Sequence, residues 1–311
     1  DISIIIWANH ILRSSITSMQ QTTKLIFEEE NLHNVEDQVA SVGEIFRLQG
    51  ASDLQDSEDK YLPSSSSGTT AIILAASRGK ELGVLTEDKP KAMIEAAGKP
   101  IISRIINAYN SSGIKSIFVV RGYRPEAFNL PNINYCDNED YDTSGEVLSL
   151  SKALSEVDKD QDIIISYGDV LFKKYVSLML LEDSSDFSIV ADTNWKHNSD
   201  GTRESDFVKC SERPSRESLG KPVSLISVNS GLLPADGYTD AEWMGMLKVK
   251  SDSRDFFFQK VEEVLKTNSK AQIPDLINTI LDSKKKVNVI YTSGHWIDID
   301  SLEDLMKASY F

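Results

Sequence analysis

Apolar side chains follow helical spacing near the start of the chain. In residues 12–48 they recur every three to four positions, which predicts two helices. Residues 51–69 are rich in Gly, Asp, Ser and Pro and poor in apolar side chains, as in a linker. Two helices cannot bury a full core by themselves, so we expect segment 1–50 to pack on another domain or on a second subunit of a homo-oligomer.

From residue 70 onward, short apolar runs alternate with amphipathic stretches. The runs are rich in β-branched residues and predict strands at 71–75, 116–120, 162–166, 187–191 and 286–291. The amphipathic stretches predict helices at about 100–111, 146–156 and 172–181. This alternation favours an α/β fold with a mostly parallel, doubly wound sheet. Ligands of such sheets bind beyond the carboxyl ends of the strands.

Composition and charge narrow the choice of partners. The formal net charge is −15, which disfavours nucleic acid and anionic membranes as partners. No apolar run reaches the roughly 20 residues that a membrane-spanning helix needs. Cys136 and Cys210 form no ligand or redox spacing, so we expect buried thiols in a reducing cytoplasm.

The first predicted strand runs into a loop of small residues. The loop consists of Leu74, Ala75, Ala76, Ser77, Arg78 and Gly79. Small side chains allow the backbone to approach a phosphate closely, with its N–H groups directed at the anion. Lys91 follows soon afterwards, behind a proline that restricts the local backbone. The loop alone is weak evidence, because small-residue turns are common in α/β proteins.

Carboxylates at two distant places complete a candidate site. Asp169 lies at the tip of the third predicted strand, and Asp298 and Asp300 lie in a strand-like run, where alternate side chains point the same way. Together they could hold Mg²⁺, whose preference for oxygen ligands suits a triphosphate substrate. The alternative is that Asp169 caps a helix and the other two acids are solvated.

These motifs together resemble a known family. The stretch "ILAASRGKELGVLTEDKPKAMIEAAGKPII" is similar to the signature of nucleotidyltransferases that make NDP-sugars and CDP-alcohols. "YCDNEDYDTSGEVLSLSKAL" resembles the base-recognition segment of choline-phosphate and phosphonate cytidylyltransferases, and "GDVLF" and "HWIDIDSLEDL" match the two metal-carboxylate elements. The resemblance covers residues 70–311 and implies a Rossmann-like nucleotidyltransferase fold.

A second resemblance concerns the start of the chain. "IIIWANHILRSSITSMQQTTKLI" is similar to the C-terminal helices of phosphoenolpyruvate mutase, and "AASRGKxLG" looks like the loop of cytidylyltransferases fused to that enzyme. The resemblance therefore implies three parts: a mutase-like helical tail at 1–50, a linker at 51–69 and a nucleotidyltransferase domain at 70–311. The mutase barrel is missing, so we expect no mutase activity from this chain.

The implied reaction transfers CMP from CTP to a small phosphonate. The acceptor would be 2-aminoethylphosphonate or, next, 2-hydroxyethylphosphonate, with Mg²⁺ held by Asp169, Asp298 and Asp300. Lys91 would bind near the α-phosphate and Lys80 near the β- and γ-phosphates. The base would contact Ala75, Ala76 and the turn formed by Ser144, Gly145 and Glu146.

The sequence departs from the family pattern at Ser77, where the family has glycine, and at Glu81, where it has a phosphate-binding arginine. Arg78 or Lys80 could supply the missing cation, and we favour Lys80. Because Glu81 replaces the arginine, an alternative is a module that binds CTP but does not catalyse a reaction. Within enzymes, the alternatives are a sugar-1-phosphate or a phosphocholine nucleotidyltransferase.

The acceptor site is the least constrained prediction. Asp192 follows a predicted strand and could pair with an ammonium group, which would lie against the indole face of Trp195. Lys209 could reach the phosphonate, and Glu242 could line the site. A capping Asp192 and a packing Trp195 explain the same residues equally well.

Overall fold

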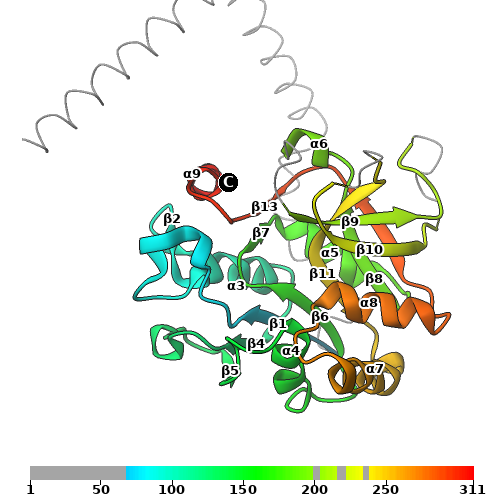
Figure 1. The fold of residues 1–311 in the computed structure, drawn as a ribbon, viewed down its shortest axis with the longest axis horizontal. Coiled ribbons are helices and arrows are strands. Elements are labelled where there is room, and N and C mark those ends of the chain that lie inside the picture. Colours follow the sequence, from blue (N-terminus) through cyan, green and yellow to red (C-terminus); the bar gives the residue numbers. More distant parts are fainter. Residues whose placement is uncertain (1–67, 199–203, 216–221, 234–237) are drawn as a thin grey trace, which may run out of the picture. The chain divides into compact units, whose positions relative to one another are not determined.

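A nine-stranded sheet forms the centre of the protein in the computed structural model (Figure 1). The structure describes residues 68–198, 204–215, 222–233 and 238–311. The helices predicted in residues 12–48, the tail at 1–50 and most of the linker lie outside these ranges. The domain division therefore stays a prediction.

The main path of the sheet runs across seven strands. In spatial order these are β10 (Leu225–Gly231), β9 (Ser205–Cys210), β11 (Ala241–Val249), β6 (Asp162–Tyr167), β1 (Thr69–Ala75), β4 (Ser116–Arg121) and β5 (Asn134–Asp137). Two further strands, β8 (Phe187–Asp192) and β12 (Asn288–Thr292), extend from β11, because β8 pairs with β11 and β12 pairs with β8.

Strand direction changes across the sheet. Strands β6, β1, β4 and β5 are parallel neighbours, and β12 is parallel to β8. Strand β11 runs antiparallel to β6, β8 and β9 and so joins the two regions. All five predicted strands are present, within one or two residues of their predicted bounds. The Rossmann-like α/β fold is thereby confirmed.

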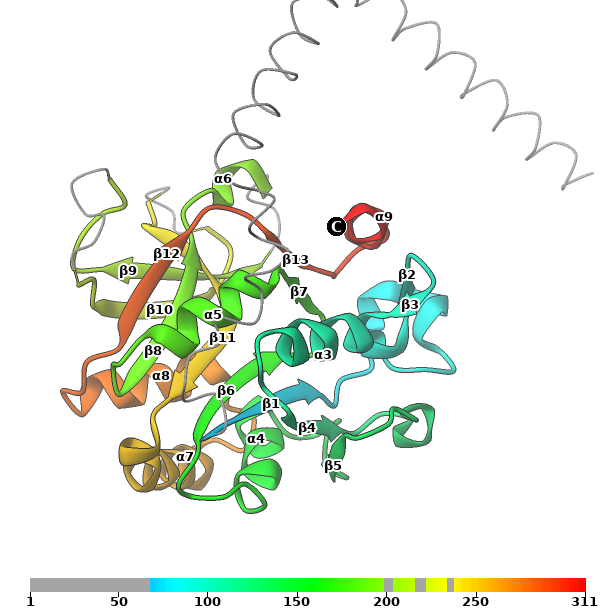
Figure 2. The ribbon, with the colours of Figure 1, turned by 180° about the vertical axis from the view of Figure 1, so that it is seen from behind.

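Helices cover both faces of the sheet, as the front and back views show (Figures 1 and 2). The covering helices are α3 (Ile101–Ser111), α4 (Glu146–Leu154), α5 (Lys174–Glu182), α7 (Arg254–Thr267) and α8 (Ile273–Asp282). The short α6 (Trp195–Asn198) follows the end of β8, and α9 (Leu302–Tyr310) packs beside the small strands Trp296–Asp298 and Glu95–Ala96. The structure confirms the predictions for α3, α4 and α5. The sequence analysis did not predict α7, α8 or α9.

Alternation along β1 determines which helices meet each face. Ile72 and Leu74 join the core that α4, α7 and α8 cover, whereas Ala71 and Ile73 join the core under α3 and α5. Successive side chains of a strand point to opposite faces, so a strand buried on both sides is apolar throughout. None of the helices in the described ranges combines the length and the apolar character needed to cross a bilayer.

A small two-stranded sheet connects the C-terminal region to the end of β6. Strand β7 (Val170–Phe172) pairs antiparallel with β13 (Trp296–Asp298), and this register places Asp298 opposite Val170. A further bond joins the Ile299 N–H to the Asp169 carbonyl at 3.3 Å. These contacts bring two segments that are about 130 residues apart to one end of the sheet. A second small sheet pairs β2 (Glu95–Ala96) with β3 (Lys99–Pro100).

Candidate active site

A cavity of about 550 Å³ opens where β1 and β6 end. Many of the residues predicted for the site line it, namely Leu74, Ala76, Ser77, Ser144, Gly145, Glu146, Asp169, Glu242, Asp298 and Asp300. Ala75 is buried beside it, and Arg78, Gly79, Lys80 and Lys91 are not among its lining residues. The carboxyl-end rule for parallel sheets thus located the cavity correctly.

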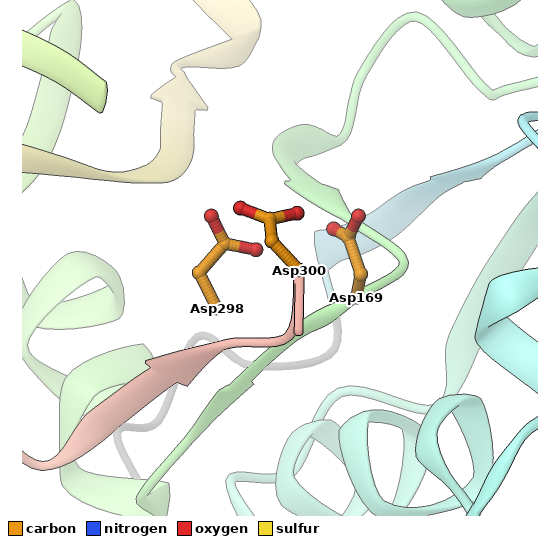
Figure 3. A group of neighbouring side chains, drawn as sticks. All are labelled: Asp169, Asp298 and Asp300. Atoms are coloured by element: carbon orange, nitrogen blue, oxygen red, sulfur yellow. The ribbon is translucent and has the colours of Figure 1, made fainter. Parts of the chain in front are cut away.

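Three aspartates meet at one side of this cavity (Figure 3). Asp169 follows the tip of β6, Asp298 ends β13, and Asp300 lies two residues further on. Each offers a carboxylate oxygen, and these oxygens all lie within 4.8 Å of one another. Three carboxylates at this separation fit a divalent cation that prefers oxygen ligands, such as Mg²⁺.

Lys91 inserts its ammonium group among these carboxylates. Its Nζ lies 2.5 Å from Asp300 Oδ1, 2.9 Å from Asp169 Oδ2 and 2.8 Å from Glu81 Oε1. The side chain is only 4% exposed. Burial by itself lowers the pKa of Lys91, but the charges of Asp169, Asp298 and Asp300 outweigh it, so the pKa is raised and the ammonium stays charged.

The small-residue loop packs directly on the stem of Lys91. Gly79 has φ of 79°, and a Cβ added there would lie 2.6 Å from Lys91 Cβ. Only glycine combines this left-handed backbone with such a close approach. The Lys91 N–H also donates to the Arg78 carbonyl at 3.0 Å, which holds the two segments together. The loop therefore helps to orient Lys91.

The two candidates for the missing cation lie elsewhere. Lys80 Nζ is 3.3 Å from Asp142 Oδ1, and both side chains are largely exposed. Arg78 donates through Nε to the Thr86 carbonyl at 3.0 Å, with its guanidinium 5.6 Å from the centre of the Tyr123 ring. In this structure neither lines the cavity, whereas Glu81 reaches Lys91.

The turn before α4 forms another wall of the cavity. Asn138 donates to Ser144 Oγ at 3.0 Å, and the Gly145 N–H donates to the Ser269 carbonyl at 2.9 Å. A Cβ on Gly145 would lie 2.2 Å from the Ala271 carbonyl oxygen, so no larger residue fits this position without a shift. The N–H of Val147 likewise donates to the Ala271 carbonyl at 3.1 Å, so the segment at 269–271 fixes the start of α4 at the cavity wall that Ser144 and Gly145 line.

Glu146 begins α4 and has an unusual pKa. Its Oε2 accepts hydrogen bonds from the Tyr167 hydroxyl at 2.8 Å and from the Ile273 N–H at 3.0 Å. Burial raises the pKa of Glu146 to about 7, the two hydrogen bonds oppose the rise, and the charges of Asp206 and Asp169 add to it. Glu146 therefore changes charge near neutral pH.

This pKa makes stability depend on pH. Between its ordinary value of 4.5 and about 7, folded Glu146 keeps a proton that the unfolded chain releases, so the free energy of unfolding falls as pH rises through this window. The loss is complete above about pH 7. Urea unfolding should show that the advantage of E146Q over wild type grows by about 1–2 kcal/mol between pH 5 and pH 8, less than the full shift because Glu146 is half-buried.

A matched control for this prediction is E262Q, which removes the same charge from an exposed position on α7. It should show the wild-type pH dependence. An E146Q advantage that is equal at both pH values would contradict the assignment of the pKa to Glu146.

Further acidic side chains line the cavity in addition to the three aspartates. We call Glu146, Glu204, Asp206 and Glu242 the acidic wall; all four line the cavity. Glu242 is 5% exposed, and burial raises the pKa of Asp206 while a hydrogen bond from the Ser230 hydroxyl opposes the rise. Among the described lining residues, eight are acidic and Lys270 is the one basic residue. This chemistry favours a ligand group with positive charge.

Of the four residues predicted to bind the acceptor, the structure brings only Glu242 to the cavity. Asp192 is fully buried, and it accepts hydrogen bonds of 2.8 Å from the N–H groups of Asn194 and Gly294 and from the Trp296 indole. Trp195 is 4% exposed. These two residues stabilise the end of β8 instead of facing a ligand.

Lys209, the fourth residue predicted to bind the acceptor, points away from the cavity because side chains alternate along its strand. Lys209 lies on β9 and is exposed, whereas Asp206, three residues earlier on the same strand, lines the cavity. Trp195 packs against Phe207 of this strand, with ring centres 5.5 Å apart. Residues at odd and even positions of a strand face opposite sides, so Asp206 and Lys209 diverge.

Sequence reasoning missed several lining residues, chiefly Tyr141, Tyr167, Asp206, Ser230, Trp243 and Lys270. A signal existed for Tyr167, which precedes the Gly-Asp tip of β6. Asp206 could have been identified from alternation, since Val208 and Cys210 on the same side of β9 are buried. The prediction of buried thiols is confirmed for Cys136 and Cys210.

Comparison with known proteins agrees with this geometry. Residues 71–212 match the family described as MobA-like NTP transferase domain. The CTP:phosphoglutamine cytidylyltransferase of Campylobacter jejuni is 27% identical over 258 residues, which cover 76% of this chain and 97% of that protein. A phosphoenolpyruvate phosphomutase of Tetrahymena pyriformis is 48% identical over 61 residues, 20% of each chain.

A solved structure extends the comparison to the fold. The inositol-1-phosphate CTP transferase of T. maritima superposes with a TM-score of 0.60 at 18% identity, covering 77% of this chain and 95% of that one. At this level of identity the likeness concerns the fold alone. Residues 71–212 are thus similar to MobA-like NTP transferase domains, the chain has a cytidylyltransferase among its relatives, and its fold is that of the nucleotidyltransferase structure.

Proposed function

We propose that the protein transfers CMP from CTP to a small phosphonate, giving a CMP-phosphonate and pyrophosphate. One observation carries this proposal. Asp169, Asp298, Asp300 and the buried ammonium of Lys91 converge beside the cavity that the small-residue loop and the α4 N-terminus also form. The cytidylyltransferase relative supports CTP as the nucleotide.

In this reaction an oxygen of the phosphonate attacks the α-phosphorus of CTP, and the bond to the β-phosphate oxygen breaks as pyrophosphate leaves. A divalent cation held by Asp169, Asp298 and Asp300 would neutralise charge on the α-phosphate and the attacking oxygen. The protein has mainly to bring two anions together and hold them in line. No covalent intermediate with a side chain is required.

The chain's own groups divide this work. Lys91 supplies a positive charge that its carboxylate neighbours keep protonated, and it would stabilise the negative charge that develops on the phosphate oxygens. The loop at Leu74–Gly79 would bind the nucleotide through backbone N–H groups. Ser144 and Gly145 would contact the base.

The acidic wall favours an acceptor that carries an ammonium group. An ammonium group would be attracted to the carboxylates of Glu146, Asp206 and Glu242, which otherwise repel one another. The aromatic rings of Tyr167 and Trp243 also line the cavity and could contact the cation. We therefore place 2-aminoethylphosphonate before 2-hydroxyethylphosphonate as the acceptor. The acidic wall takes over the role that the sequence suggested for Asp192 and Trp195.

The short match to the phosphomutase of Tetrahymena pyriformis supports a link to phosphonate chemistry. Its 61 residues are close in number to the segment that precedes the nucleotidyltransferase domain. We propose that residues 1–50 are the tail of such a mutase, residues 51–69 a linker and residues 70–311 the transferase domain. A mutase and a cytidylyltransferase in one chain would act in the same sequence of reactions.

Pyrophosphate release tests the proposal directly. We expect turnover with CTP, Mg²⁺ and 2-aminoethylphosphonate that exceeds turnover with 2-hydroxyethylphosphonate, phosphocholine, phosphoglutamine or glucose-1-phosphate. The variant D206N should raise KM for 2-aminoethylphosphonate by about tenfold, because it removes one charge facing the ammonium, and should leave KM for 2-hydroxyethylphosphonate within about twofold.

Other outcomes would select a different function. Turnover with glucose-1-phosphate or phosphocholine alone would indicate the corresponding nucleotidyltransferase. CTP binding without turnover on any acceptor would favour the binding module, which the Glu81–Lys91 ion pair makes a specific alternative. Equal effects of D206N on both phosphonates would show that the acidic wall does not recognise the ammonium.

A further inference from the structure

The ammonium of Lys91 occupies oxygens that a divalent cation also needs. It bonds to Asp300 Oδ1 at 2.5 Å and lies 2.9 Å from Asp169 Oδ2, and both residues belong to the three-aspartate cluster. Two cations so close to the same carboxylates repel each other. Lys91 and the divalent cation are therefore competitors for the cluster unless another group holds part of the lysine.

Glu81 is such a group. It lies in the first turn of the 3₁₀ segment Lys80–Thr86, outside the three-aspartate cluster, and its Oε1 is 2.8 Å from Lys91 Nζ. Its side chain is 43% exposed, in contrast to the 4% of Lys91. An ammonium has three N–H donors. One of the three carboxylates around Lys91 thus comes from a segment that does not take part in the metal site.

We propose that Glu81 is a positioning residue for Lys91: it binds part of the ammonium, so that Asp169 and Asp300 hold the lysine less tightly and a divalent cation can compete for the cluster. This inference rests on the proposed function in one respect, the assignment of the cation to these aspartates. It gives Glu81 a role at the position where the family resemblance leads one to expect a phosphate-binding arginine.

Removing the charge of Glu81 changes the balance between the two cations. In E81Q one of the three carboxylates around Lys91 loses its charge, and the ammonium is attracted more strongly to Asp169 and Asp300. A divalent cation then has to displace an ammonium that the cluster holds more tightly. In K91M the competitor is gone, and Glu81 has nothing left to position.

Binding of Mn²⁺ to the full chain, measured by electron paramagnetic resonance without nucleotide or acceptor, tests this inference. We expect E81Q to weaken Mn²⁺ binding about tenfold and K91M to tighten it about tenfold. In the K91M background, E81Q should change binding less than about twofold. The control E87Q removes the same charge from an exposed position just after the same segment and should bind Mn²⁺ like wild type.

Two results would overturn the proposal while leaving the metal site intact. One is wild-type Mn²⁺ affinity in E81Q. The other is an equal loss from E81Q in the wild-type and K91M backgrounds, which would show that Glu81 acts as a general negative charge and not through Lys91. If the wild-type chain binds no Mn²⁺, or if D169N binds Mn²⁺ as well as wild type does, the assignment of the metal to these aspartates is wrong, and this inference falls with it. The Mn²⁺ measurement uses no acceptor, so a failure of all the acceptors in the pyrophosphate-release test would not affect it.

Discussion

Replacing Asp169 with asparagine should lower kcat by at least about 10³-fold, because one ligand charge is lost from the cluster that we propose holds the divalent cation. Asp169 lies at the tip of β6, and its backbone carbonyl is bonded to Ile299 between the other two aspartates. Asparagine keeps the shape of the side chain, so the fold and the β7–β13 pairing should remain. Pyrophosphate release with CTP and 2-aminoethylphosphonate measures the effect.

The matched control is D252N, which makes the same change at a side chain that is 80% exposed and does not line the cavity. It should retain wild-type kcat. Thermal unfolding should place the midpoints of D169N and wild type within a few degrees. Turnover by D169N above about one tenth of the wild-type rate would be incompatible with a metal-holding role for Asp169.

The second large effect concerns Lys91. We expect K91M to lower kcat by about 10²–10³-fold, the range found when one preorganised charge or donor is removed from a transition-state site. Methionine fills a similar volume next to Gly79 and removes only the charge, so packing of the loop should persist. Because K91M should also bind Mn²⁺ more tightly, its loss of turnover cannot be attributed to loss of the metal.

K89M is the matched control, since it makes the same substitution two residues earlier in the same segment, outside the cavity. It should turn over like wild type. We expect K91R to be little more active than K91M. The guanidinium is larger than the ammonium, and a side chain that is only 4% exposed leaves no room for it. A K91M variant with wild-type kcat would assign the ammonium a purely structural role.

Local patterns in the sequence were sufficient for much of the fold and part of the site. Apolar runs rich in β-branched residues located β1, β4, β6, β8 and β12. Strands β1 and β8 are buried at every position, as expected of strands covered on both faces. The position of Asp169 at a strand end, and the spacing of Asp298 and Asp300, followed from the same reasoning. These features depend on neighbours in the chain, which a sequence displays directly.

Other features depend on which segments meet in space. The pairing of Glu81 with Lys91 and the burial of Asp192 beneath Trp296 join residues that no local pattern connects. The acidic wall assembles from α4, β9 and β11, and the antiparallel course of β11 brings these elements together. The sequence offered Lys80, ahead of Arg78, as the missing cation, and only the fold showed that their partners are Asp142 and the Thr86 carbonyl.

The sequence by itself therefore determined the α/β fold, the strand ends that face the cavity and the three aspartates. Tertiary structure alone decided which cation joins them and which other acids line the cavity. The physical reason is that periodicity fixes the side of an element on which a residue lies, whereas the charge environment of that residue depends on the distance to groups far along the chain.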